Sequence, residues 1–247
     1  NSAVMGSDEY GFILTGANTF AGTMTISSST YVRIGGSAAG ATDGNAGNNG
    51  SLSASAAIVN NGVLRLTRND TWTLANKITG SGALKVGGTI GTSTSQVVTL
   101  SGANEYTGAT TIVVGTAKVG VASVVDVSGA FGKNSAVTVT NAANTAIDLN
   151  GYDTQIGSLA GGGALGGNVI LGAKTLTIGG DNTSTSFGGI ISGSGGSLTK
   201  NGTGTLTLTG ANTYSGTTTV NTGGLTLSTG GSLSSSTALA LASGTFT

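Results

Sequence analysis

The sequence predicts an all-β chain wound into a parallel β-solenoid, with about 20 residues per coil and roughly 12 coils in a chain of 247 residues. Three observations predict this fold: short segments with alternating apolar and polar residues, frequent turn dipeptides between them, and internal repeats. The composition agrees, because Gly, Ser, Thr and Asn make up about 55% of the chain, whereas Gly alone is usually about 7%. We expect residues 1–247 to form one elongated segment.

The strands are predicted from period-two alternation. In residues 205–209, TLTLT, the leucines face one side and the threonines the other, as in a half-buried strand. Eight other segments alternate in the same way: Val32–Ile34, Leu64–Leu66, Trp72–Leu74, Leu84–Val86, Ala136–Val139, Leu176–Ile178, Leu225–Leu227 and Leu239–Leu241. The turns between them are predicted at Asp43-Gly44, Asn49-Gly50, Asn61-Gly62, Asn150-Gly151 and Asn201-Gly202. An antiparallel sandwich or barrel would show the same pattern of short strands and frequent turns, so the internal repeats are needed to distinguish it from a solenoid.

Three copies of one motif favour the solenoid. Residues 14–22 read LTGANTFAG, residues 100–108 read LSGANEYTG and residues 208–216 read LTGANTYSG. Each copy is followed by Thr and then Ile or Val at the same offset. Two successive alternating strands, at 206–208 and 225–227, lie 19 positions apart, which fits one coil of about 20 residues. With about 4.8 Å between stacked strands, the rod would be about 60 Å long.

The repeat positions are expected to have structural roles. Glycine should take the corners, asparagine should bond neighbouring backbone or join an amide ladder, and the aromatic residue should cover the coil below. These positions are Gly16, Asn18, Phe20, Gly22, Gly102, Asn104, Tyr106, Gly108, Gly210, Asn212, Tyr214 and Gly216.

The segment 35–57 is rich in Gly, Ala and Asn and poor in large apolar residues. We expect it to protrude as a loop, either as a place where a partner binds or as a flexible excursion without one. Residues 87–96 read as an insertion between matched strands.

The composition excludes several classes of function. The chain has no His and no Cys, so Ser-His-Asp and Cys-His pairs and Cys/His zinc sites are excluded, and we expect no cofactor or metal. Nine basic residues balance nine acidic ones, so nucleic acid is not an expected partner. No apolar run is long enough for a membrane helix, and residues 1–10 do not resemble a signal peptide.

The three copies, and above all residues 191–227, ISGSGGSLTKNGTGTLTLTGANTYSGTTTVNTGGLTL, resemble the passenger-associated transport repeat of bacterial autotransporters. Residues 147–180 are similar to the sequence that precedes such repeats. The resemblance implies a right-handed parallel β-helix that is exported across the outer membrane and displayed on the cell or released from it. It also implies a membrane-embedded barrel that lies outside this chain.

Two features of the sequence are candidates for chemistry. Asp148 and Asp153 flank a turn, and some parallel β-helices are lyases that combine Asp-bound calcium with a basic residue; the basic residue closest in sequence is Lys133. Solvated corner carboxylates are the simpler interpretation. Trp72 is expected in the core, although an exposed position would suit a sugar platform.

Two other patterns are weaker. Gly161, Gly163 and Gly166 satisfy the dinucleotide-binding spacing, but no helix pattern follows them. The threonines around 205–209 and 217–219 resemble ice-binding arrays, but the row is local.

We therefore expect a non-enzymatic extracellular rod that acts in adhesion, autoaggregation or biofilm formation, with other copies of itself or a host or neighbour cell surface, protein or glycan, as partner. The alternatives are a subunit of a self-assembling extracellular filament and a β-helix polysaccharide lyase or hydrolase.

Overall fold

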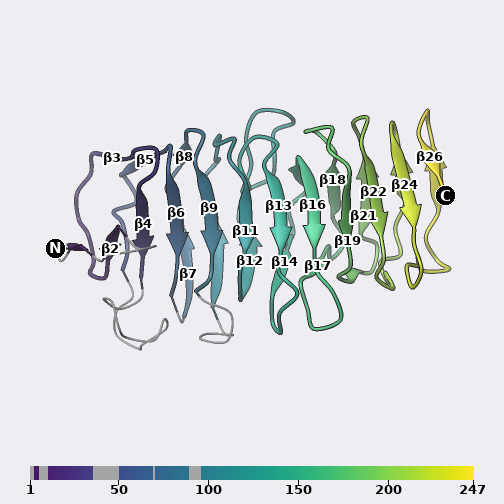
Figure 1. The fold of residues 1–247 in the computed structure, drawn as a ribbon, viewed down its shortest axis with the longest axis horizontal. Coiled ribbons are helices and arrows are strands. Elements are labelled where there is room, and N and C mark those ends of the chain that lie inside the picture. Colours follow the sequence, from purple (N-terminus) through teal and green to yellow (C-terminus); the bar gives the residue numbers. More distant parts are fainter. Residues whose placement is uncertain (1–2, 6–10, 36–49, 69, 89–95) are drawn as a thin grey trace.

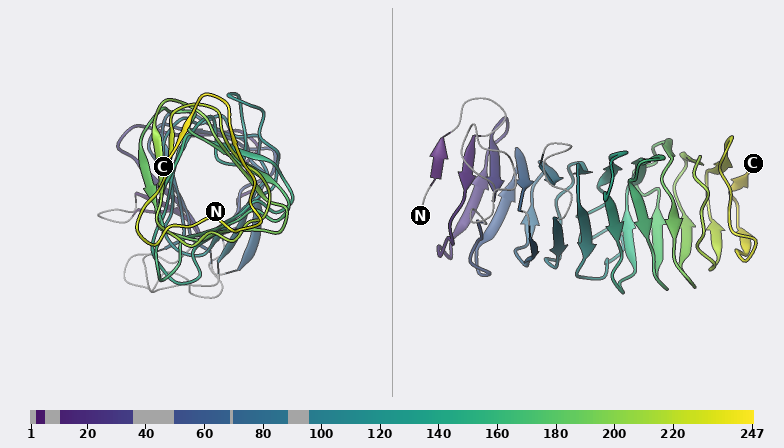
Figure 2. Two further views of the ribbon diagram at one scale, coloured as in Figure 1. Left: turned by 90° about the vertical axis from the view of Figure 1, so that its right-hand side faces the viewer. Right: turned by 90° about the horizontal axis from the view of Figure 1, so that it is seen from below.

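A computed structural model describes residues 3–5, 11–35, 50–68, 70–88 and 96–247 of the chain. These residues form 26 short β-strands, and no helix occurs among them. The strands stack coil upon coil into a rod, with the N- and C-terminal ends of the chain at opposite ends (Figure 1). The view along the rod shows successive coils superimposed around a common axis (Figure 2). The predicted all-β solenoid is confirmed.

Three faces surround the axis. The long sheet contains β1 (Ala3–Met5), β2 (Phe12–Leu14), β4 (Tyr31–Ile34), β6 (Val63–Leu66), β9 (Ala83–Val86), β11 (Thr110–Ile112), β13 (Ala136–Val139), β16 (Ser158–Gly161), β19 (Thr185–Phe187), β22 (Thr205–Leu208), β24 (Gly224–Leu227) and β26 (Thr245–Phe246). The second sheet contains β7 (Thr71–Leu74), β10 (Val97–Leu100), β12 (Thr116–Val119), β14 (Ala146–Asp148), β17 (Asn168–Ile170) and β20 (Ile191–Ser192).

The third face is divided between two smaller sheets. Near the N-terminal end it contains β3 (Thr23–Ile26), β5 (Ala57–Asn60) and β8 (Ile78–Thr79). Toward the C-terminal end it contains β15 (Thr154–Ile156), β18 (Thr175–Ile178), β21 (Ser197–Lys200), β23 (Thr218–Val220) and β25 (Leu239–Leu241). Eight of the nine predicted alternating segments therefore fall within strands, and the ninth, 205–209, extends one residue beyond β22.

Apart from β1, which pairs antiparallel with β2, the strands of successive coils pair in parallel, and the coil length varies. Leu206 pairs with Leu225, which is 19 positions later, as the sequence predicts. Val32, however, pairs with Leu64, 32 positions later. The solenoid consequently makes about ten turns, fewer than the predicted twelve, because several corners carry additional residues.

Most of the predicted loop at 35–57 lies outside the described residues, which resume at position 50. Its last part belongs to a coil: Gly50 is buried, and Ala57 begins β5. A Cβ atom on Gly50 would lie 1.7 Å from the Leu14 carbonyl oxygen, so the chain passes too close for any side chain. Most of the predicted insertion at 87–96 also lies outside the described residues, except for its two ends.

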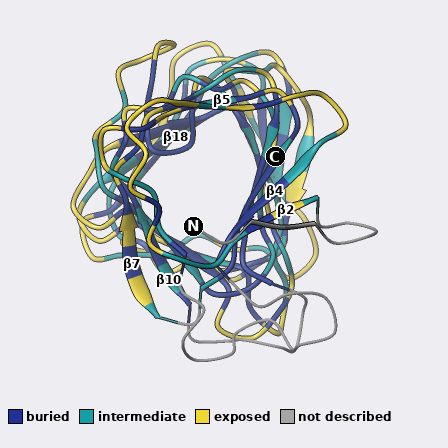
Figure 3. Cartoon of the chain, turned by 90° about the vertical axis from the view of Figure 1, so that its left-hand side faces the viewer, coloured by how far each residue is buried: buried dark blue, intermediate teal, exposed yellow. Residues whose placement is uncertain are grey.

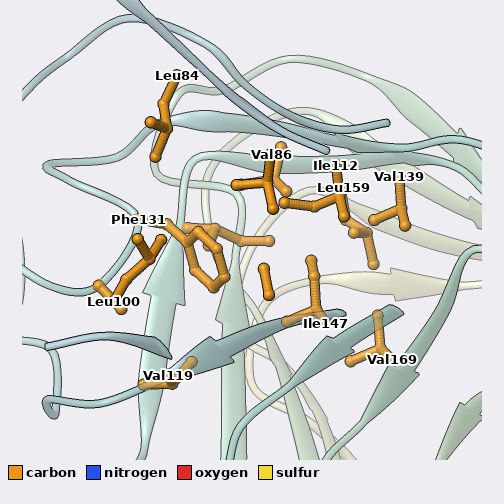
Figure 4. Close-up of a cluster of buried hydrophobic side chains, with 14 of the residues drawn as sticks. Leu84, Val86, Leu100, Ile112, Val119, Phe131, Val139, Ile147, Leu159 and Val169 are labelled. Atoms are coloured by element: carbon orange, nitrogen blue, oxygen red, sulfur yellow. The ribbon is translucent and has the colours of Figure 1, made fainter. Parts of the chain in front are cut away.

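The core is a set of apolar ladders inside the coils. Leu66, Val86, Ile112 and Val139 occupy paired positions in consecutive coils of the long sheet, and each is fully buried. Figure 4 shows Val86, Ile112 and Val139 of the long sheet facing Val119, Ile147 and Val169 of the second sheet across the interior, with Phe131 beside them. Seen from the end of the rod, buried residues line the inner side and exposed residues form the outer turns (Figure 3). Each fully buried aliphatic side chain contributes about 1.5–3 kcal/mol to folding.

A buried lysine lies at one corner of the C-terminal coils. Lys200 is almost fully buried, and its Nζ donates hydrogen bonds to the backbone carbonyls of Asn201 and Gly202. Burial lowers the pKa of the Lys200 ammonium, and the nearby Asp181 opposes this effect. The lysine thus caps carbonyl groups at a corner where the backbone turns away from the sheet.

Candidate functional site: a neutral groove at one corner of the coils

The corner where the long sheet passes into the second sheet carries a groove. Its walls are two loops, 140–145 between β13 and β14 and 162–167 between β16 and β17, which project from the lower edge of the rod in Figure 1. The groove has a volume of about 750 Å³, and its floor is the outer face of the second sheet, including Thr116 and Ala146. It is assembled from several coils, from Gln96 in the insertion to Ser192 in β20.

The loop 162–167 is a tight hairpin with an apolar tip. Gly163 and Gly166 exchange two backbone hydrogen bonds, of 2.9 and 3.2 Å. The Leu165 amide donates to Asn141 Oδ1 at 2.9 Å, which fastens the tip to the preceding coil. The Leu165 side chain is nevertheless 70% exposed. A second hollow, of about 520 Å³, lies on the other side of this hairpin.

Two isoleucines and an asparagine line the groove beside the hairpin. Ile170 and Ile190 are each 41% exposed beside the hairpin. Asn168 Oδ1 accepts a hydrogen bond from the Ile190 amide at 2.9 Å. Below the surface, the Thr145 hydroxyl is buried and has no hydrogen-bond partner among the described residues. The groove therefore combines aliphatic surface with neutral polar groups on a backbone that is firmly held.

None of the described residues that line the groove is charged. Without a carboxylate, ammonium or imidazole group, these walls have no general acid or base. They suit a ligand surface that is itself uncharged and partly apolar.

The repeat asparagines lie between coils and bond to backbone. Asn104 accepts a hydrogen bond from the Ile78 amide at 2.8 Å and donates to the Ala130 carbonyl at 2.8 Å. Asn212 accepts from the Ile191 amide at 2.9 Å and donates to the carbonyls of Gly210 and Ser232 at 2.9 and 3.0 Å. The Asn18 amide likewise donates to Gly16 and Ser51, at 2.8 and 3.0 Å.

The repeat aromatics separate into two groups. Tyr106 and Tyr214 are fully buried, and their hydroxyls bond to Thr110 and Thr218 at 2.6 and 2.5 Å. Phe20, by contrast, is 39% exposed. The sequence contained a signal for this difference, because the residue four positions after each tyrosine is threonine, whereas Met24 holds that place after Phe20.

The repeat glycines divide in the same way between copies. In the second and third copies a Cβ atom would meet another coil: one on Gly108 would lie 2.2 Å from the Gly82 carbonyl oxygen, and one on Gly210 would lie 2.2 Å from that of Gly189. Gly102 and Gly216 have similarly close neighbours. Gly16 and Gly22 in the first copy have nothing within 4 Å of that position.

The paired carboxylates at 148 and 153 have separate structural partners. Asp148 accepts the Asn150 amide at 2.8 Å and lies 3.3 Å from the ammonium of Lys118, which stacking brings next to it in place of the sequence neighbour Lys133. Asp153 accepts the amide of Thr175 in the next coil at 2.8 Å.

The other candidates also have structural surroundings. Trp72 is buried, with the Arg68 guanidinium 4.7 Å from its ring centroid. Thr207 pairs with Thr226 on one side but with Ser186 on the other, so the threonine row is short. Gly161, Gly163 and Gly166 lie at the end of β16 and in the hairpin, where no helix follows within the described chain.

Within the described ranges, no group of three or more His, Cys, Asp or Glu residues could hold a metal ion. The same part of the chain has no helix that is long and apolar enough to cross a membrane.

Comparison with known proteins identifies the repeats. The family model for the passenger-associated-transport-repeat matches residues 12–28, 96–116 and 198–232. The chain is 44% identical over 120 residues to the adhesin BmaC autotransporter of Brucella suis biovar 1 (strain 1330). That similarity covers 48% of this chain but 3% of the relative's length. No solved structure matches the chain.

Proposed function

Because this chain carries the passenger-associated transport repeats of an autotransporter, we propose that it is a non-enzymatic part of an adhesive rod presented at the bacterial cell surface. The observation that carries this proposal is the combination of the repeats with a stacked solenoid that exposes a neutral groove along one corner. The rod serves as a spacer, and the loops at that corner are its contact surface.

The similarity to an adhesin supports this assignment, but the shared region is a small part of that protein. The distribution of polar groups supports it independently. The carboxylates at 148 and 153 accept backbone hydrogen bonds in different places, and the groove walls carry no ionisable group among the described residues. Binding without turnover is the function that this surface supports best.

The partner of this surface is uncharged in the region of contact. Aliphatic side chains around Leu165 bind apolar patches, and the amides of the groove form hydrogen bonds with neutral polar groups. Such surfaces occur on glycans and proteins of a neighbouring cell and on other copies of the same rod. Because long-range charge attraction contributes little, attachment should change little with salt concentration.

Adhesion of coated beads tests the proposal. Beads that carry the purified chain should attach to epithelial or bacterial cells more than beads coated with an unrelated β-solenoid. Attachment should persist in about 0.5 M salt, which strongly screens interactions between exposed charges. Leu165→Asn should reduce attachment, because this tip is exposed and its loss leaves the coils intact. Thr229→Asn, at an exposed turn elsewhere on the rod, is the matched control.

Two results would overturn the assignment. One is attachment no greater than that of the control beads. The other is cleavage of a polysaccharide or ester by the purified chain, abolished by Asp148→Asn or Asp153→Asn.

A further inference from the structure

The floor of the groove is a column of side chains that lies in register along the rod. Its members occupy the same outward position in five successive coils at the second sheet: Val97, Thr116, Ala146, Asn168 and Ile190. Strands β12, β14 and β17, which carry the middle three, lie side by side (Figure 1). With about 4.8 Å between stacked strands, this column is about 19 Å long and runs parallel to the axis.

Apolar and polar side chains alternate along this column. The polar members are Thr116 and Asn168, so a polar group recurs at every second coil, about 9.6 Å apart. The Thr116 hydroxyl and the Asn168 Nδ2 have no hydrogen-bond partner among the described residues. The Asn168 side chain is nevertheless held in place, because its Oδ1 accepts a hydrogen bond from the Ile190 amide at 2.9 Å. Between the two polar groups, the short side chain of Ala146 leaves room for a ligand above the sheet.

The neighbouring column on the same face carries a compensated ion pair. The Lys118 ammonium lies 3.3 Å from the Asp148 carboxylate, and neither residue lines the groove. A ligand in the groove therefore meets hydroxyl, amide and aliphatic groups of the described residues and no net charge. An ionised ligand would lose hydration there without gaining an opposite charge, so the groove favours an uncharged one.

An extended peptide does not match this floor. Strands β12, β14 and β17 are paired along both edges, so the floor has no free backbone edge to which a peptide strand could add. A peptide lying along the axis would also advance about 3.3 Å per residue and place side chains of one side about 6.6 Å apart, whereas the floor repeats at about 4.8 Å. Its contacts with the floor would lose register within two coils.

We propose that the groove binds an uncharged, extended polysaccharide chain that lies parallel to the rod. A sugar unit of such a chain is nearly as long as one coil is high. In a β-linked chain successive units face opposite ways, which matches a polar group at every second coil. The carbon faces of the rings lie on Val97, Ala146 and Ile190, and sugar hydroxyls bond to Thr116 and Asn168. The inference rests on the proposed function, because it specifies what the adhesive groove contacts.

An NMR titration with cellohexaose, an uncharged and extended β-linked glucose oligosaccharide, tests the proposal. The signals of the Thr116 backbone amide and the Asn168 side-chain amide should shift, and maltohexaose, a coiled α-linked chain of the same sugar, should bind more weakly. Thr116→Val removes one hydrogen-bonding group and keeps the shape, so it should weaken the affinity about fivefold. Thr177→Val, in β18 on the third face, is the matched control and should leave the affinity unchanged. Ala146→Phe fills the middle of the floor and should abolish binding.

The proposal is overturned by the absence of any shift with cellohexaose, by equal affinity for the two oligosaccharides, or by an unchanged affinity in Thr116→Val. Groove signals that respond instead to a neutral peptide of alternating Ser and Val, or to the concentration of the protein itself, would also overturn it. Attachment of coated beads to cells reports on the proposed function separately. Beads that attach although cellohexaose does not bind would leave the adhesive rod standing and refute its glycan ligand, whereas binding of cellohexaose without attachment would do the reverse.

Discussion

The asparagine between coils allows a quantitative test of what holds the stack together. Asn104 is almost fully buried and satisfies two backbone groups of other coils, the Ile78 amide and the Ala130 carbonyl. Replacing it by alanine leaves both groups without that partner. A buried polar group left unsatisfied costs about 1–3 kcal/mol, so the loss of a partner for two such groups in Asn104→Ala should destabilise its region by about 2–6 kcal/mol.

Native-state hydrogen exchange is the appropriate assay, because coils of a solenoid can open separately and a single global transition is not assured. In Asn104→Ala the Ile78 amide should exchange at least about 30-fold faster, which corresponds to about 2 kcal/mol. Asn18→Ala is the matched control: Asn18 donates only to carbonyls and is more exposed, so its loss should cost about 1 kcal/mol. If Ile78 exchanges as slowly in the variant as in the parent chain, the hydrogen bond does not stabilise the stack and the reasoning is wrong.

Three further predictions concern single positions. Gly108→Ala should lower the unfolding midpoint in urea, because its Cβ would lie 2.2 Å from a carbonyl oxygen, whereas Gly16→Ala should change it little because the space there is open. Burial raises the pKa of Tyr214 from 10.0 to about 12. The protonated hydroxyl therefore stabilises the fold below about pH 10, and this contribution is lost between about pH 10 and 12. In Tyr214→Phe, the unfolding free energy should decline less over that pH range. Gln155→Ala should loosen the turn around Asp126, because Gln155 bonds to both the backbone amide and the carboxylate of Asp126. The Asp126 amide should therefore exchange faster in the variant; an exchange rate equal to that of the parent chain would contradict this role.

The sequence was sufficient to predict the coil but not its surface. Alternation in residues such as Leu206 and Leu208 requires one buried face, and the repeated motif sets the pairing of equivalent strands, so fold class and strands could be predicted. The predicted number of turns was too high, because the corners between strands vary in length and the alternation within strands does not predict that length. The exposed position of Phe20 does not follow from the residues that the three copies share, because it depends on Met24, which stands where the other two copies have threonine.

The groove could not be predicted, since stacking brings together residues as far apart as Gln96 and Ser192. The same holds for the hydrogen bond between the side chains of Asp126 and Gln155, which are 29 positions apart. The carboxylate at 148 shows the same effect: Lys133 is the basic residue closest to it in sequence, but stacking places Lys118 beside it. In a solenoid, the spatial neighbour of a surface residue lies one coil away. Its separation in sequence depends on the length of every corner in that coil, which the alternation of the strands does not predict.

The parallel stacking of coils has a mechanical consequence. The strands run across the rod, so the hydrogen bonds between coils point along its axis. Tension applied to the two ends therefore pulls on the bonds of one terminal coil before those of the next. A coil of about 20 residues that peels away lengthens the tether by about 65 Å, in place of the roughly 4.8 Å that it occupied in the stack. A cell held through such a rod in flowing liquid would be retained by a tether that yields coil by coil, dissipating sudden loads before the terminal contact breaks.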